Sequence, residues 1–195
     1  MRPAVFLDRD GTMIHEAGYL SRLEDLRWFP WTSEAIRLLN RAGFVVCVTT
    51  NQGGIGLGFF TEGFVAELHR RMTETLEAGG ARVDGWFHCP HHPSAIVETL
   101  RADCDCRKPR PGMINQAIAR FGIDPARSFV VGDKLIDVEF ATRAGARGVL
   151  VTTGYGEEVV REHGGTVPGA AHVAGDLMAA VAWILAGSRP TAEPV

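Results

Sequence analysis

Short apolar runs alternate along this chain with longer segments of helical periodicity. Each apolar run ends in a charged residue, a threonine or a glycine-rich turn, as buried parallel strands do at the carboxyl edge of a sheet. The expected strands are residues 4–8, 44–50, 83–88, 128–133 and 148–153. The expected helices, which carry apolar residues three and four positions apart, are residues 33–41, 62–78, 111–121, 136–144 and 176–185.

This alternation predicts an α/β fold, a Rossmann-like three-layer sandwich in which helices cover both faces of a central parallel sheet. Ligands of such folds bind beyond the carboxyl ends of the strands. We expect one domain over residues 1–187, without a large cap domain and with a metal-bound loop at 88–110. Residues 188–195 carry two prolines and are expected to form a flexible tail.

Composition narrows the class of protein. Hydrophobic residues make up 46% of the chain and charged residues 22%, the values of an ordinary globule. The formal net charge of −3 offers no positive potential for a nucleic acid. No apolar run approaches the roughly 20 residues that span a bilayer, and the chain enters a strand at once instead of a signal peptide. We therefore expect a cytoplasmic protein, without nucleic-acid or membrane partners, that works as a monomer.

Asp8 and Asp10 follow the first expected strand at positions i and i+2, where both carboxylates can approach one small volume. Two like charges at that distance repel each other, and a divalent cation or a shared proton relieves the cost. The pair therefore suggests a magnesium site. The alternative is that each aspartate caps a helix or forms a local turn, which is a common use of aspartate in loops.

The sequence from Asp8 to Thr12 resembles the first motif of the haloacid dehalogenase-like phosphatases, and three further strand ends agree with that family. The resemblance implies that Asp8 is the nucleophile and that Asp10 is the acid/base partner. It further implies that Thr50 and Lys108 stabilise the phosphoryl group, although Lys108 could also be a solvated surface lysine. Asp8, Asp10 and Asp133 would hold Mg²⁺, and Asp137 would support them from outside. The residues expected to bind substrate are Arg9, Asn51, Gln52, Arg107 and Lys134.

Cys89, His91, Cys104 and Cys106 supply three thiolates and an imidazole in two short pairs, the composition of a closed tetrahedral zinc site. Four protein ligands leave no open position, so a structural role fits better than catalysis. His88 and His92 compete with His91 for the histidine position. The alternative is a set of free buried thiols with incidental histidines.

The motif combination resembles one branch of the superfamily, the sugar bisphosphate phosphatases of carbohydrate metabolism, whose substrate is a small phosphorylated sugar. Histidinol-phosphate phosphatases share the first motif and the cysteines, but the fourteen residues between Cys89 and Cys104 favour the sugar branch. A non-catalytic module that binds a phosphorylated ligand is the alternative of another class, and the intact Asp8 and Asp10 pair argues against it.

Overall fold

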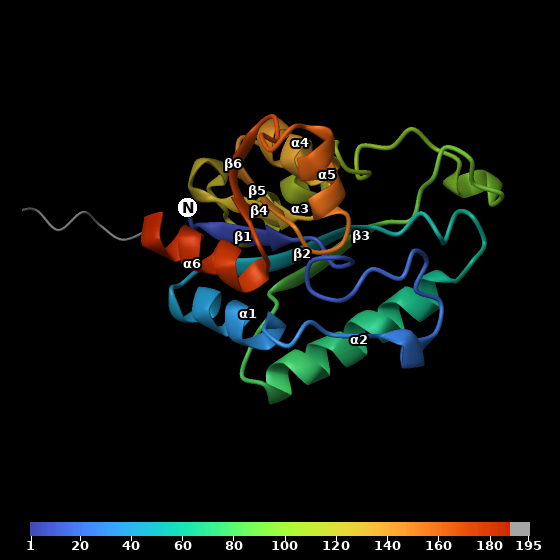
Figure 1. The fold of residues 1–195 in the computed structure, drawn as a ribbon. Coiled ribbons are helices and arrows are strands. Elements are labelled where there is room, and N and C mark those ends of the chain that lie inside the picture. Colours follow the sequence, from blue (N-terminus) through green and yellow to red (C-terminus); the bar gives the residue numbers. More distant parts are fainter. Residues whose placement is uncertain (188–195) are drawn as a thin grey trace, which may run out of the picture.

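A computed structural model describes residues 1–187, and the expected flexible tail at 188–195 lies outside the described residues. A six-stranded parallel sheet forms the centre, with strand order β3-β2-β1-β4-β5-β6 (Figure 1). Its strands are β1 (Ala4–Leu7), β2 (Val45–Asn51), β3 (Gly85–Cys89), β4 (Phe129–Gly132), β5 (Arg147–Val151) and β6 (Ala170–Ala174). The expected Rossmann-like fold is confirmed.

Helices cover both faces of the sheet. One face carries α1 (Thr32–Arg41), α2 (Glu62–Ala78) and α6 (Leu177–Gly187). The other carries α3 (Gly112–Phe121), α4 (Leu135–Arg143) and α5 (Gly156–Glu162). Three single-turn 3-10 helices, Leu23–Asp25, Glu98–Leu100 and Pro125–Arg127, lie in the connections between the described elements.

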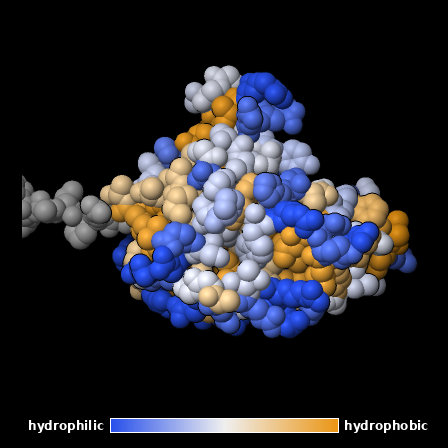
Figure 2. Space-filling model, turned by 60° about the horizontal axis from the view of Figure 1, so that its bottom comes forward, coloured by the Kyte–Doolittle hydropathy of each residue, from blue (hydrophilic) through white to orange (hydrophobic). Residues whose placement is uncertain are grey.

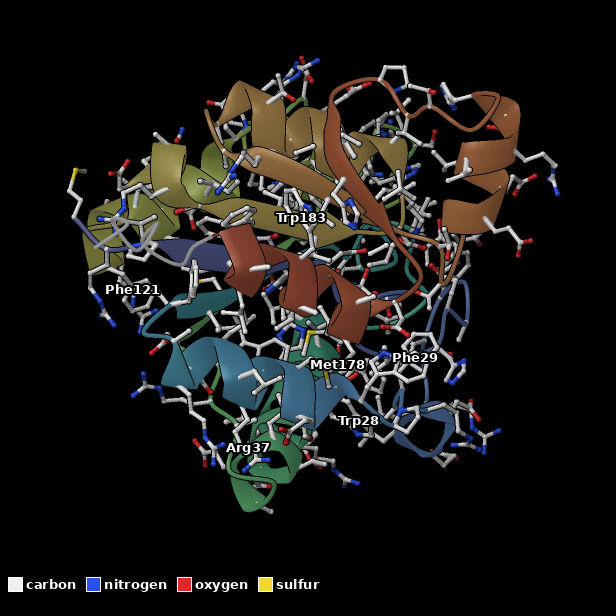
Figure 3. The ribbon with its side chains drawn as sticks, turned by 60° about the vertical axis from the view of Figure 1, so that its left-hand side comes forward. Trp28, Phe29, Arg37, Phe121, Met178 and Trp183 are labelled. Atoms are coloured by element: carbon white, nitrogen blue, oxygen red, sulfur yellow. The ribbon has the colours of Figure 1, made fainter. Side chains whose placement is uncertain are left out.

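Alternate residues of the central strands divide between two apolar cores. Val5 and Leu7 of β1 pack with the α1, α2 and α6 side, whereas Ala4 and Phe6 pack with α3 and α4. All four side chains are fully buried, as a strand with helices on both faces requires. Trp183 of α6 packs against the core on the α1, α2 and α6 side (Figure 3). Its ring is edge-on to Phe129, with 6.0 Å between the ring centroids.

Two elements were missed from the sequence, β6 and α5. The edge strand β6 is rich in alanine and mostly half-buried, so neither strand propensity nor alternation marks it. The seven-residue helix α5 begins with a glycine and buries only that residue, so it has no apolar stripe to detect. Both lie beyond β5 in sequence, away from the central strands that carry the site.

The surface over α1 and α2 is largely hydrophilic, with apolar atoms in separate patches (Figure 2). Across residues 1–187, no helix has the length and apolarity that crossing a membrane would take.

Candidate active site

The strand order reverses at β1, and the carboxyl ends of β1, β2 and β4 meet at this point. Open parallel sheets bind ligands at such a reversal because the connecting chains diverge there and leave a crevice. Asp8 directly follows β1, Thr50 and Asn51 end β2, and Asp133 directly follows β4. The sequence therefore places polar groups at the edge where the fold opens.

Asp8, Asp133 and Asp137 bring one carboxylate oxygen each to within 4.8 Å of one another. All three residues are buried, with at most 5% of their surface exposed. Asp137 comes from the first turn of α4, where its Oδ2 accepts from the Lys134 backbone N–H at 3.1 Å. Three buried oxygen donors at this spacing suit a hard divalent cation such as Mg²⁺.

Lys108 carries the positive charge of this cluster. Its Nζ donates to Asp8 Oδ1 at 2.8 Å, to Asp137 Oδ1 at 2.6 Å and to the Thr49 carbonyl at 3.0 Å. Its side chain is only 2% exposed, so it is not a solvated surface lysine. Burial disfavours the charged ammonium, but Asp137 and Asp8 outweigh it and hold the pKa of Lys108 above its usual value.

Burial and mutual repulsion disfavour the charged form of these carboxylates. Burial raises the pKa of Asp8 to about 6, although the Lys108 charge opposes the rise. Burial, followed by the charge of Asp8, raises the pKa of Asp133 to about 8. One oxygen of Asp133 accepts from the Tyr155 N–H at 2.8 Å, and the other is buried without a hydrogen-bond partner. A cation at the cluster would both relieve the repulsion and satisfy this orphaned oxygen.

Two glycines make room for Asp133. A Cβ at Gly11 would lie 2.2 Å from Asp133 Oδ2, and a Cβ at Gly154 would lie 2.1 Å from the same atom. Both glycines also have positive φ angles, 79° and 57°. The loops after β1 and β5 thus close directly over the carboxylate.

The Asp10 carboxylate turns away from this cluster. Both of its oxygens accept hydrogen bonds from the Arg9 guanidinium, at 2.8 to 3.2 Å, and Oδ2 also accepts from Gln52 Nε2 at 3.0 Å. The cluster consists of Asp8, Asp133 and Asp137. The sequence analysis expected Asp10 in the position that Asp137 occupies. The roles of these two carboxylates toward magnesium remain predictions.

Three of the expected substrate-binding residues make internal contacts. Arg9 is 1% exposed and Gln52 is 4% exposed, and Gln52 also donates to Thr50 Oγ1 at 2.8 Å. The Asn51 amide accepts from the Lys108 N–H at 3.0 Å and donates to the Lys108 carbonyl at 3.2 Å. Asn51 thus fixes the backbone of the lysine that contacts Asp8.

A cleft opens above these groups. On its rim, Lys134 Nζ donates to Glu16 Oε2 at 3.0 Å and lies 4.7 Å from the centre of the Tyr155 ring. The cleft has a charged floor and a partly aromatic wall. Its lining includes Asp8, Arg9, Asp10, Glu16, Tyr19, Thr50, Asn51, Gln52, Phe60, Lys108, Lys134 and Asp137.

The end of β3 and the loop that follows it carry a second set of side chains that could bind a metal. The ligand atoms of Cys89, His91, Cys104 and Cys106 all lie within 4.8 Å of one another, and the four could hold a metal ion. The three sulfur–sulfur distances are 3.2 to 3.5 Å, and no disulfide joins them. Neither His88 nor His92 belongs to this cluster. Arg107 follows directly, and its guanidinium donates to the His91 carbonyl at 2.9 Å.

Two residues of the site were missed from the sequence. Glu16 contacts Lys134 across 118 positions, a pairing that no local pattern reveals. His69 lies 3.3 Å from the Arg9 guanidinium. Its signal was a polar residue on the apolar stripe of α2, beside Val65, Leu68, Met72 and Leu76.

Comparison with known proteins agrees with this geometry. Residues 105–180 match the family described as "HAD-hyrolase-like". D-glycero-D-manno-heptose-1,7-bisphosphate 7-phosphatase of Thermosynechococcus vestitus is 39% identical over 97% of this chain and 98% of that protein. D-glycero-beta-D-manno-heptose-1,7-bisphosphate 7-phosphatase of Escherichia coli K12 is 43% identical over 78% of this chain and 80% of that protein.

Solved structures agree as well. A D,D-heptose 1,7-bisphosphate phosphatase from B. bronchiseptica, crystallised with magnesium and phosphate, superposes with a TM-score of 0.85 at 32% identity. That match covers 96% of this chain and all of the other. The corresponding phosphatase of Burkholderia thailandensis gives a TM-score of 0.70 at 32% identity, with the same coverage.

The fold and the strand-end constellation define a phosphatase of the haloacid dehalogenase-like class. Within that class, the chain belongs to the family of D-glycero-D-manno-heptose-1,7-bisphosphate 7-phosphatases. The comparisons confirm the expected enzyme family, the sugar bisphosphate phosphatases. They favour this family over the histidinol-phosphate phosphatase and the binding-module alternatives.

Proposed function

We propose that the protein hydrolyses the 7-phosphate of D-glycero-D-manno-heptose 1,7-bisphosphate, a step toward nucleotide-activated heptose. The observation that carries the proposal is the placement of Asp8 beside Lys108 and two further buried carboxylates, at the floor of an open cleft. A relative that matches 97% of the chain bears the name of this activity.

In the proposed reaction, Asp8 attacks phosphorus and a carboxylate–phosphorus bond forms while the bond to the sugar oxygen breaks. Asp10 donates a proton to the leaving alkoxide. Asp10 then takes a proton from the water that hydrolyses the aspartyl-phosphate. Lys108 neutralises charge on Asp8 and on the transferring group, and Thr50 lies at the same strand edge to hold a phosphoryl oxygen by hydrogen bonding.

Mg²⁺ is the cation we propose for Asp8, Asp133 and Asp137, because their donors are all oxygens and one of them lacks any other partner. When bound, it would neutralise charge on the phosphoryl oxygens. Zn²⁺ is the ion we propose for the cysteine cluster, because three soft sulfur donors and one imidazole favour it.

The second phosphate of the substrate needs its own cations. Lys134 stands on the rim of the cleft, and Arg107 is held next to the metal-binding loop by its bond to His91. We assign both to the 1-phosphate and the sugar, together with Asn51, Arg9 and Gln52 at the cleft floor.

The proposal extends to the cellular setting. Three thiols that bind zinc must stay reduced, which favours the cytoplasm. A cleft built from the strand ends of one sheet is consistent with a single domain acting as a monomer.

Magnesium-dependent phosphate release from the heptose bisphosphate tests the proposal. Asp8→Asn removes the nucleophile, and we expect activity to fall at least about a thousandfold. Asp10→Asn keeps the contacts to Arg9 as far as an amide can and removes the transferable proton, so we expect a loss of about a hundredfold or more.

Asp103→Asn serves as the control, because Asp103 lies on the exposed part of the cysteine loop and pairs with Arg110. Its activity should match that of the unmodified protein. Unchanged release in Asp8→Asn would refute the mechanism. Faster turnover of histidinol phosphate than of the heptose bisphosphate would refute the substrate.

A further inference from the structure

Arg9 is the largest fully buried side chain of the described residues, and its position depends on the acceptors around it. The NH2 group donates to Asp10 and to Gln52 Oε1, the latter at 3.0 Å, and Nε donates to Asp10. For NH1, the acceptor found within the described part of the chain is Nε2 of His69 at 3.3 Å. A buried guanidinium donor without an acceptor would be costly, so His69 completes the set.

The surroundings of His69 fix both its protonation state and the orientation of its ring. Its ring stacks on Trp86 with centroids 4.5 Å apart and an angle of 24° between the planes. Burial, followed by the charge of Arg9, lowers the pKa of His69 to about 2. The ring is therefore neutral. Because the Arg9 guanidinium can only donate, Nε2 must be the nitrogen that carries the lone pair.

Helix α2 brings this ring to the site. Thr61 caps the N-terminus of the helix, and its hydroxyl accepts from the Phe64 N–H at 3.1 Å. His69 lies on the buried stripe of α2, where its ring contacts Arg9 of the loop after β1. The ring is absent from the cleft lining, so it has no direct route to substrate.

We infer that His69 is a positioning residue for the phosphatase reaction: it fixes the Arg9 guanidinium, which in turn orients the Asp10 carboxylate toward the leaving group. This inference rests on the proposed function, because it assigns Asp10 the acid/base role. The chain of contacts runs from His69 to Arg9 to Asp10, with Gln52 closing the far side through its bonds to Arg9 and Asp10.

The decisive variants are His69→Phe, which keeps an aromatic ring against Trp86 but removes the acceptor, and His69→Gln, whose amide oxygen can reach the place of Nε2. Without the acceptor, Arg9 is free to tilt, and Asp10 loses its fixed direction. We expect His69→Phe to lower kcat about tenfold, a fraction of the contribution of a general acid. KM should rise by a smaller factor than kcat falls, because Arg9 also lines the cleft, and His69→Gln should recover most of the lost kcat.

Thr73→Val is the matched control, because it deletes the hydrogen bond from Thr73 Oγ1 to the His69 carbonyl at 2.8 Å and leaves the ring untouched. Its kcat should equal that of the unmodified protein. Thermal denaturation confirms that each variant is folded, and His69→Leu replaces His69→Phe if the latter does not fold.

The assay is steady-state phosphate release from the heptose bisphosphate with saturating Mg²⁺. An unmodified protein without activity would refute the proposed function itself. If the unmodified protein is active, an unchanged kcat in His69→Phe overturns the inference alone. Equal losses in His69→Phe and His69→Gln also overturn it, because they would indicate a requirement for shape and not for an acceptor.

Discussion

Replacing Lys108 with methionine removes one buried charge from between two others. Lys108 Nζ lies 2.8 Å from Asp8 Oδ1 and 2.6 Å from Asp137 Oδ1. At an effective dielectric constant of about 20, each contact is worth roughly 6 kcal/mol of gross attraction. Desolvation of the ions offsets much of this, and breaking a buried pair typically costs about 3–5 kcal/mol.

The assay is thermal denaturation at pH 7.5 in a metal chelator. A loss of 3–5 kcal/mol corresponds to a melting temperature lower by roughly 10 °C for a chain of this length. Mg²⁺ should restore more stability to Lys108→Met than to the unmodified protein, because a cation at the carboxylates replaces the missing charge. At pH 5 the difference should shrink, since the unpaired carboxylates can take up protons.

Lys134→Met is the matched control, because Lys134 is the other lysine of the sequence and its side chain is 35% exposed. A partly exposed pair such as Lys134 with Glu16 contributes about 0–1 kcal/mol. The charge of Lys134 also acts on Asp133 and Asp8, so Lys134→Met tests whether any nearby positive charge has the same effect as the buried one. If Lys108→Met loses no more stability than Lys134→Met, the reasoning is refuted. The buried charge of Lys108 would then contribute no more to stability than the partly exposed charge of Lys134.

Two further predictions concern the metal sites. One equivalent of zinc should copurify with the reduced protein, and Cys104→Ser should lose it and become more sensitive to proteolysis around Lys108; metal analysis that finds no zinc contradicts this. The second is a pH effect in chelator: because the pKa of Asp133 is raised to about 8, the folded protein retains a proton that the unfolded chain has released. The free energy of unfolding should therefore fall as pH rises from 7 to 8, a range in which His69 is largely neutral in the unfolded chain as well as in the folded one. Urea unfolding should show that Asp133→Asn or Mg²⁺ abolishes the fall, and an equal slope in Asp133→Asn would contradict the assignment.

The central strands and the strand-end residues were predictable because burial on both faces forces continuous apolar runs, and the chemistry begins where those runs stop. Asp8, Thr50 and Asp133 fall at such ends. Side-chain direction was not predictable. Asp10 turns to Arg9 and Asp137 joins the cluster because of contacts with Gln52 and Lys108, which are distant in sequence. His69 was missed for the same reason, since a helical stripe shows that a residue is buried but not which group it meets.

Backbone hydrogen bonds join the cysteine loop to the end of β2, beside the cluster of carboxylates. The Gln52 N–H donates to the Cys89 carbonyl at 2.8 Å, and the Gly56 N–H donates to the Pro90 carbonyl at 3.2 Å. The Asn51 side chain bonds to both the backbone N–H and the backbone carbonyl of Lys108. The same loop therefore fixes Gln52, which contacts Asp10, and Lys108, which contacts Asp8. An ion held by the four side chains of this loop would therefore help to set the positions of Asp8 and Asp10, the two carboxylates proposed for catalysis, without contacting either one.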